Sequence, residues 1–233
     1  MKRDWSKARP VRVSTGAKRK RPSRAPAPTE IVVSPCWDNR SRGTLTFGAT
    51  TVRCALGRGG VATNKREGDG ATPFGRYEIV ARLIRRDRLP APATTPPMEA
   101  IRAGDGWCDD AKSGAYNRPI PLPSRLGHEE MWRDDGLYDV VLVLDHNLRR
   151  RTRSRGSAIF FHVATIGYEP TAGCVAISIA DMRRLLPRLP RRAFLRILLP
   201  GGGARSKNRR ADAHMGRARL DRQLEIRAHS HRQ

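Results

Sequence analysis

Residues His162 and Cys174 have the types and the spacing of a base and a thiol nucleophile. His162 follows an apolar run at 158–161, and Cys174 precedes a second apolar run at 175–177. The loop between them contains Gly and Pro, and short apolar runs bounded by such residues predict buried strands. A turn between two strands can place an imidazole beside a thiol, where it can take the thiol proton and leave a nucleophilic thiolate.

The residue before the cysteine is Gly173, and its lack of a side chain lets the backbone approach a substrate closely. We expect the N–H groups of Gly173 and Cys174 to face the oxyanion that forms during acyl transfer. An imidazolium at His162 would also lower the pKa of the Cys174 thiol below its ordinary value of about 8.5. The alternative is a structural thiol in the core, because Cys is among the residue types most often buried.

This segment resembles the signature of the L,D-transpeptidase (YkuD-type) catalytic domain, a family that cross-links or trims bacterial peptidoglycan through a cysteine. In that signature, a His at a strand end is followed by a loop and by Ser/Thr-His-Gly-Cys. The matching positions here are His162, Thr171, Gly173 and Cys174. Ala172 stands where the family usually has a second His, and Ala176 where an Arg commonly follows the cysteine. The first departure weakens inferences about oxyanion contacts and leaves the proposed Cys–His pair intact.

A second motif, GDGATPFGRY at residues 68–77, resembles a Gly-Asp-Gly-x-Thr-Pro-x-Gly-x-Tyr/Phe motif of the same family. We expect a structural role for it, because Pro73 and Gly75 are ordinary turn residues. A phosphate-binding loop is the weaker interpretation, since the chain lacks the G-x-x-x-x-G-K-[ST] pattern and no helical pattern follows.

Two polar, aromatic segments at 107–119 and 127–139 resemble pieces that line the approach to the cysteine in a subgroup of the family. The resemblance therefore implies roles in substrate binding for residues on these segments and beside the cysteine. The candidates are Thr171, Tyr116, Arg118 and Trp132.

The sequence predicts neither a metal site nor a cofactor. His128, Glu129 and Glu130 lack the H-E-x-x-H spacing of a zinc site, and none of the four cysteines forms a C-x-x-C pair. Cys108 is a poor candidate nucleophile, because the carboxylates of Asp109 and Asp110 would raise its pKa.

Positive charge dominates the composition. The chain of 233 residues carries a net charge of +24, of which residues 1–30 contribute +8 and residues 201–233 contribute +6. Both segments are polar and poor in core residues, so we expect disordered basic tails around one domain at 31–200. The charge favours polyanions such as nucleic acid or an anionic wall polymer as partners of the tails.

We expect a mainly β domain, namely an L,D-transpeptidase-like β-sandwich with one or two helices. Ser178 and Asp181 predict the start of a helix, and the prolines of residues 88–106 predict a loop. Besides the runs around the catalytic candidates, strands are predicted at 44–47, 51–56, 77–81, 139–145 and 194–199.

No segment has the ~20 apolar residues of a membrane span, and residues 1–30 lack the apolar stretch of a secretory signal. The family acts on the wall outside the cytoplasmic membrane. The resemblance therefore implies a periplasmic or wall location, whereas the N-terminal segment leaves a cytoplasmic one open.

The predicted reaction is acyl transfer. The resemblance implies that Cys174 attacks the amide between a diamino acid and a terminal D-alanine of a peptidoglycan stem peptide, with His162 as the base. It also implies acylation of the thiol by carbapenems. Two alternatives stay open: a non-catalytic protein that binds a polyanion or the cell wall, in which Ala172 marks a lost activity, and a cytoplasmic cysteine hydrolase or amidase.

Overall fold

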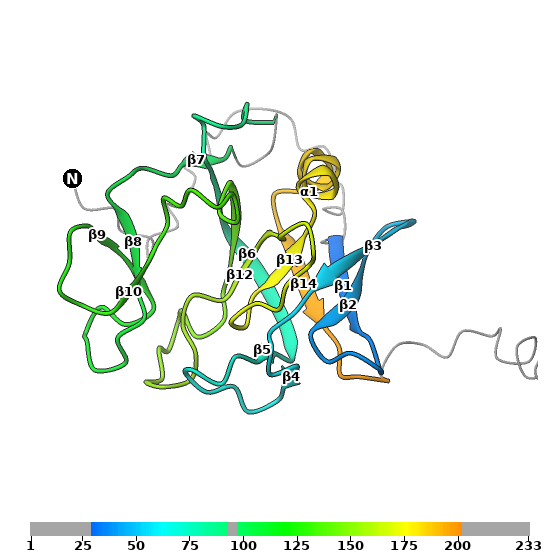
Figure 1. Cartoon of the computed structure of the whole chain (residues 1–233), viewed down its shortest axis with the longest axis horizontal. Helices are drawn as coiled ribbons and strands as arrows, with labels where there is room; N and C mark the ends of the chain where they lie inside the picture. The colour runs from blue at the N-terminus through cyan, green and yellow to red at the C-terminus, as the bar shows by residue number, and fades with distance from the viewer. Residues whose placement is uncertain (1–28, 93–96, 202–233) are drawn as a thin grey trace, which may run out of the picture. The chain divides into compact units, whose positions relative to one another are not determined.

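The computed structural model describes residues 29–92 and 97–201 (Figure 1). In these ranges, eight strands of the nine-stranded main sheet form a closed ring: β1 (Thr29–Pro35), β2 (Arg42–Phe47), β3 (Thr50–Ala55), β6 (Gly75–Ile84), β11 (Val140–Leu144), β12 (Phe160–Val163), β13 (Val175–Ile177) and β14 (Ala193–Ile197). The remaining elements are β4 (Val61–Ala62), β5 (Thr72–Pro73), β7 (Glu99–Ala100), β8 (Asp105–Cys108), β9 (Arg118–Pro121), β10 (His128–Glu130), α1 (Ile179–Leu185) and a 3-10 helix at Leu186–Arg188.

Strand β6 closes the sheet, because it pairs with β14 on one side and with β11 on the other. From β6 the order runs β11, β12, β13, β3, β2, β1 and β14, and β7 pairs with β6 in addition. Closure leaves the ring without exposed strand edges. The expected fold class is confirmed: the domain is mainly β and has one α-helix in the part that the structure describes.

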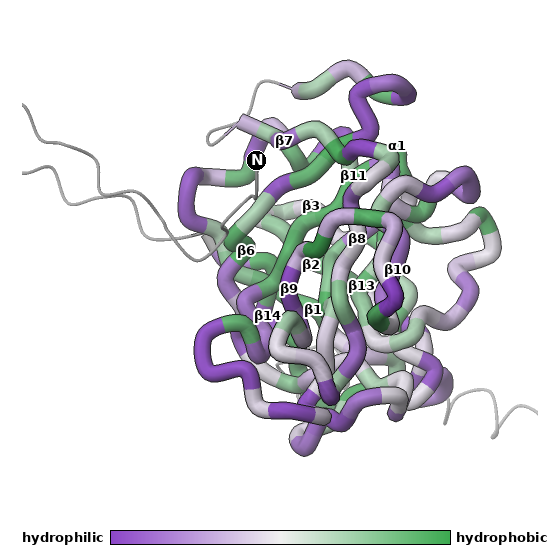
Figure 2. The backbone as a smooth tube through the Cα atoms, turned by 90° about the vertical axis from the view of Figure 1, so that its left-hand side faces the viewer, coloured by the Kyte–Doolittle hydropathy of each residue, from purple (hydrophilic) through white to green (hydrophobic). Residues whose placement is uncertain are grey.

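Apolar side chains pack on both faces of β11 and β12. Val140, Leu142 and Leu144 belong to the larger core with Phe161, whereas Val141 and Val143 point to a second core. That second core lies under the small sheet of β10, β8 and β9, through Trp107 and Met131. Figure 2 shows hydrophobic residues along β11 and hydrophilic ones in β10 and in the outer loops. Because both faces are covered, β11 reads as a continuous apolar run.

The strand that carries His162 begins two residues later than the apolar pattern predicts, at Phe160. The helix begins as predicted, because Ser178 caps it by accepting a hydrogen bond from the Asp181 N–H at 3.1 Å. Strand β1 begins at Thr29, two residues before the predicted domain start. Predictions for residues 1–28 and 202–233 lie outside the described residues.

The GDG motif forms a loop that packs tightly on the end of β3. The carboxylate of Asp69 accepts hydrogen bonds from the Arg66 N–H at 2.7 Å and the Ala71 N–H at 2.8 Å, and it pairs with the buried ammonium of Lys65. A Cβ on Gly57 would lie 2.1 Å from the Gly70 carbonyl oxygen. The close approach of these two backbones therefore requires glycine.

We predict that Gly57→Ala lowers the melting temperature by roughly 3–10 °C, because overpacking at this contact forces the backbones apart. The matched control is Gly114→Ala, where an added Cβ meets nothing within 4 Å. Scanning calorimetry of both variants checks the prediction. Equal melting temperatures for the two variants would contradict it.

Candidate active site

Two threonines hold the backbone of Cys174. The Thr171 hydroxyl donates to the Cys174 carbonyl at 2.7 Å and accepts from the Gly173 N–H at 3.2 Å. The Thr72 hydroxyl, from the GDG motif, lies 3.4 Å from the same carbonyl. The Thr171 N–H donates to the Leu56 carbonyl at 2.9 Å, so the turn is tied to the end of β3. Thr171 thus fixes the turn before the cysteine.

Gly173 is required where it stands. Its φ of +138° lies in a region that other residues rarely adopt. A Cβ there would also approach the Ala71 carbonyl oxygen to 2.9 Å. The Gly in the family signature is therefore explained by backbone conformation and by contact with the GDG loop.

The Cys174 thiol lies beside the start of β12 and is buried, with 6% of the residue exposed. It donates to the Ala158 carbonyl at 3.2 Å and accepts from the Phe160 N–H at 3.3 Å. Burial raises the pKa of this thiol to about 12, and the nearby Glu129 carboxylate adds to the increase. The resting cysteine is therefore a neutral thiol.

His162 lies on the same face of the sheet as Cys174, on the neighbouring parallel strand. Its register partner is Ala176, two residues after the cysteine, so the two side chains are diagonal neighbours on this face. The Nδ1 atom lies 2.8 Å from the Val163 carbonyl oxygen, so Nδ1 carries the proton and Nε2 has the lone pair. Burial lowers the pKa of the imidazole to about 4.

The resting state therefore differs from the thiolate–imidazolium pair that we expected from the sequence. Burial disfavours both charged forms, and it moves the pKa of Cys174 up and that of His162 down. A proton can pass from the thiol to Nε2 only if something else stabilises the charges that result. A substrate carbonyl that is attacked by the sulfur stabilises them, because its oxygen takes the negative charge of the thiolate.

A cavity of about 670 Å³ opens in front of the pair. Thr171 and Ala172 line one part of it, and the small side chains of Ala172 and Ala176 leave room where the family usually has His and Arg. Strand β10 and the segment after it line another part, as the resemblance implies for residues 127–139. Their lining residues are His128, Glu129, Glu130, Arg133, Leu137 and Tyr138.

Three of the four substrate-binding candidates do not line this cavity. The buried Tyr116 donates its hydroxyl hydrogen bond to Glu67. Arg118 begins β9, in register with Cys108. Trp132 packs on the second core, and the Arg85 guanidinium lies over its ring at 3.5 Å. The structure brings only Thr171 together with the Cys–His pair, and the roles of the other three stay predictions.

Asn117 is an important residue that sequence reasoning missed. Its buried side chain accepts from the Trp107 indole at 3.0 Å and from the Ala158 N–H at 3.1 Å. Its amide nitrogen donates to the His146 and Asn147 carbonyls at 3.1 and 3.0 Å. Asn117 therefore helps hold Ala158 at a positive φ of 49°, and the Ala158 carbonyl receives the thiol hydrogen bond.

Glu129 and Tyr138 were also missed as individual site residues. The Tyr138 hydroxyl donates to the Glu129 carboxylate, and its ring meets the His162 imidazole edge-on at 5.3 Å between centroids. Burial raises the pKa of Glu129 and of Tyr138. A carboxylate and a phenol thus lie in the cavity next to the candidate nucleophile and base.

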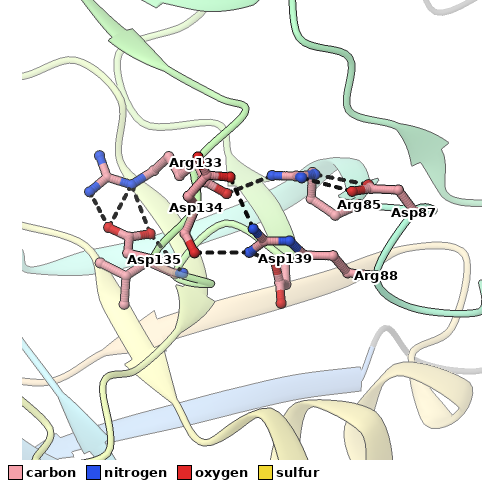
Figure 3. A network of polar contacts seen from close by, with 8 residues as sticks. Arg85, Asp87, Arg88, Arg133, Asp134, Asp135 and Asp139 are labelled. Carbon is pink, nitrogen blue, oxygen red and sulfur yellow. Dashed lines mark hydrogen bonds and ion pairs between the residues drawn. The ribbon is translucent and has the colours of Figure 1, made fainter.

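A network of ion pairs fastens this part of the cavity wall to the end of β6 (Figure 3). Arg88 lies 3.0 Å from Asp134 and 3.2 Å from Asp139, and Arg85, paired with Asp87 at 2.7 Å, donates to the Arg133 carbonyl at 2.5 Å. Most of these side chains are partly exposed, so each pair contributes little stability alone. Their joint effect is to fix the segment that carries Leu137 and Tyr138.

A family model described as the L,D-transpeptidase catalytic domain (YkuD) matches residues 37–199. The chain belongs to this family. The match covers every strand of the closed sheet except β1, and it contains every site residue named above. No curated protein matches the chain.

L,D-transpeptidases act on peptidoglycan peptides, and the family is typically associated with the cell wall or periplasm. The described residues contain no group of three or more His, Cys, Asp and Glu side chains placed to hold a metal ion. No helix in residues 29–92 and 97–201 is long and apolar enough to cross a bilayer.

We predict that alkylation of Cys174 by iodoacetamide in the free protein keeps accelerating above pH 9, because burial raises the thiol pKa to about 12. Peptide mapping by mass spectrometry follows the modification of this one cysteine, and Cys174→Ala confirms the assignment. A plateau with a midpoint below pH 8.5 would instead show a thiolate–imidazolium pair in the resting protein.

Proposed function

We propose that this protein transfers acyl groups from peptidoglycan stem peptides through a thioester on Cys174, with His162 as general base and acid. The observation that supports this most strongly is the placement of the two side chains. They are diagonal neighbours on adjacent strands and share one cavity, and the imidazole has its lone pair on Nε2.

In the first step, Nε2 of His162 takes the thiol proton while Sγ of Cys174 bonds to the carbonyl carbon of the diamino acid. The carbonyl oxygen becomes an oxyanion. The Gly173 N–H already donates to Thr171, so we assign the Cys174 N–H as the oxyanion donor. Proton transfer and attack proceed together, because burial leaves the thiol and the imidazole neutral beforehand.

In the second step, the oxyanion collapses and the C–N bond breaks. The imidazolium of His162 gives its proton to the leaving nitrogen, and D-alanine departs as the free amino acid. The thioester is then resolved by an amine of a second stem, which forms a cross-link, or by water, which trims the stem. His162 again takes the proton of the attacking group.

A second candidate function is non-catalytic binding of an anionic polymer. A hollow of about 310 Å³, remote in sequence from Cys174, is lined by Ser113, Gly114, Tyr116, Arg149, Arg150, Arg151 and Arg153. Four guanidinium groups without a lining carboxylate favour an anionic ligand. Binding at this surface requires no thiol. A Cys174 variant should therefore lose acyl transfer and keep polymer binding.

We predict that Cys174→Ala reduces release of D-alanine from a stem tetrapeptide by on the order of a thousandfold or more, because the nucleophile is lost. Chromatography with mass detection measures the release. The variant should melt within a few degrees of the wild type, since the change removes one sulfur atom. Cys108→Ala, which changes a buried cysteine outside the cavity, is the matched control. Full activity of Cys174→Ala would refute the proposed role of Cys174 as the nucleophile.

A further inference from the structure

Glu129 is a carboxylate in the cavity that the proposed reaction does not use. It is half-buried and lines the cavity with Cys174 and His162. Its charge acts on the thiol, because it is one of the causes that raise the pKa of Cys174. Within residues 29–92 and 97–201, Glu129 has no ion-pair partner. A half-buried carboxylate without a cation is costly unless something else solvates it.

Tyr138 supplies one hydrogen bond and fixes the orientation of the carboxylate. Its hydroxyl donates to Glu129, and its ring is held between the His162 imidazole and the Phe160 ring, at 5.3 and 5.8 Å between centroids. Arg133 acts on Glu129 through its charge, but its guanidinium is already engaged with Asp135 at 3.1 Å. The carboxylate therefore keeps capacity for a further donor.

The electrostatics around Glu129 favour a cation from outside the protein. Burial raises its pKa, and the charges of Asp109 and Glu67 add to the increase, whereas the Tyr138 hydrogen bond and the charge of Arg133 lower it. A bound ammonium would lower that pKa. It would also offset the charge that disfavours the Cys174 thiolate, so one ligand relieves both groups.

We propose that Glu129, oriented by Tyr138, is a specificity-determining residue that binds a primary ammonium group of the substrate beside Cys174. This inference rests on the proposed function for the identity of the substrate, where the ammonium is that on the side chain of the diamino acid. Binding places the cation near the thiol at the moment of attack. Substrates with this amine are therefore selected over uncharged analogues.

The test compares two reagents that form a disulfide with the thiolate of Cys174 and release methanesulfinate. One is 2-aminoethyl methanethiosulfonate, which carries an ammonium, and the other is the neutral methyl methanethiosulfonate. The ratio of their rates cancels any change in the thiolate fraction, because both react with the same thiolate. Mass spectrometric peptide mapping assigns the modification to Cys174.

We predict that Glu129→Gln lowers the ratio of cationic to neutral rates about tenfold, because a charge-assisted hydrogen bond is lost. Tyr138→Phe keeps the ring against His162 and should lower the ratio in part. The matched control is Glu130→Gln, which changes an exposed carboxylate on the same cavity wall and should leave the ratio within about twofold. An unchanged ratio in Glu129→Gln, or an equal decrease in Glu130→Gln, would overturn the proposal.

A second measurement separates this inference from the proposed function. It compares kcat/KM for a stem tetrapeptide with a free side-chain amine and for its N-acetylated form, in the wild type and in Glu129→Gln. Turnover of both forms without preference, together with an unchanged reagent ratio, refutes the role of Glu129 but supports the proposed acyl transfer. Absence of turnover with either peptide refutes the proposed function, whereas the reagent ratio still decides whether Glu129 binds an ammonium.

Discussion

The burial of Cys174 and His162 between the closed sheet and the small β10–β8–β9 sheet governs the chemistry of the site. Burial favours the neutral form of each group, and it moves the pKa of the thiol to about 12 and that of the imidazole to about 4. In water the ordinary pKa values of a thiol and an imidazole differ by about two units. The wider difference here makes proton transfer from Cys174 to His162 less favourable in the absence of substrate. The arrangement keeps the thiol unreactive until a substrate occupies the cavity. A substrate that carries a compensating charge then binds more strongly, since electrostatic interactions are strong where water is excluded.

Hydrogen bonds and close backbone contacts hold the buried Cys174 in place. The turn before the cysteine is held by Thr171 and by Thr72 of the GDG motif, and Gly173 fits only because it lacks a side chain. On the other side, Asn117 holds Ala158, whose carbonyl accepts the hydrogen bond of the thiol. These contacts join four stretches of the chain that are distant in sequence. The small side chain of Ala172 leaves the cavity open where the family usually has a second His, and no contact in the structure makes it a catalytic group.

Local patterns predicted much of this fold from the sequence. The apolar run of β11, the cap at Ser178 and the signature around Cys174 all depend on neighbouring residues. The strands β9 and β10 could not be predicted, because Arg118–Pro121 and His128–Glu130 have no apolar alternation. They gain their order by pairing with β8, whose Trp107 packs in the second core. Asn117, Glu129 and Tyr138 were missed for the same reason. Their roles come from hydrogen bonds and ring contacts made in the folded chain. The pKa values of Cys174 and His162 likewise depend on burial by distant segments.

The central claim is that Cys174 becomes acylated with the help of His162. The most direct test is intact-mass detection of a carbapenem adduct, because opening of the β-lactam ring adds the whole drug to the acylated thiol. We predict one adduct per chain in the wild type, mapped to Cys174, and an acylation rate lower by at least about tenfold in His162→Gln, as for loss of a general base. No adduct on Cys174, or an equal rate in His162→Gln, would contradict the account.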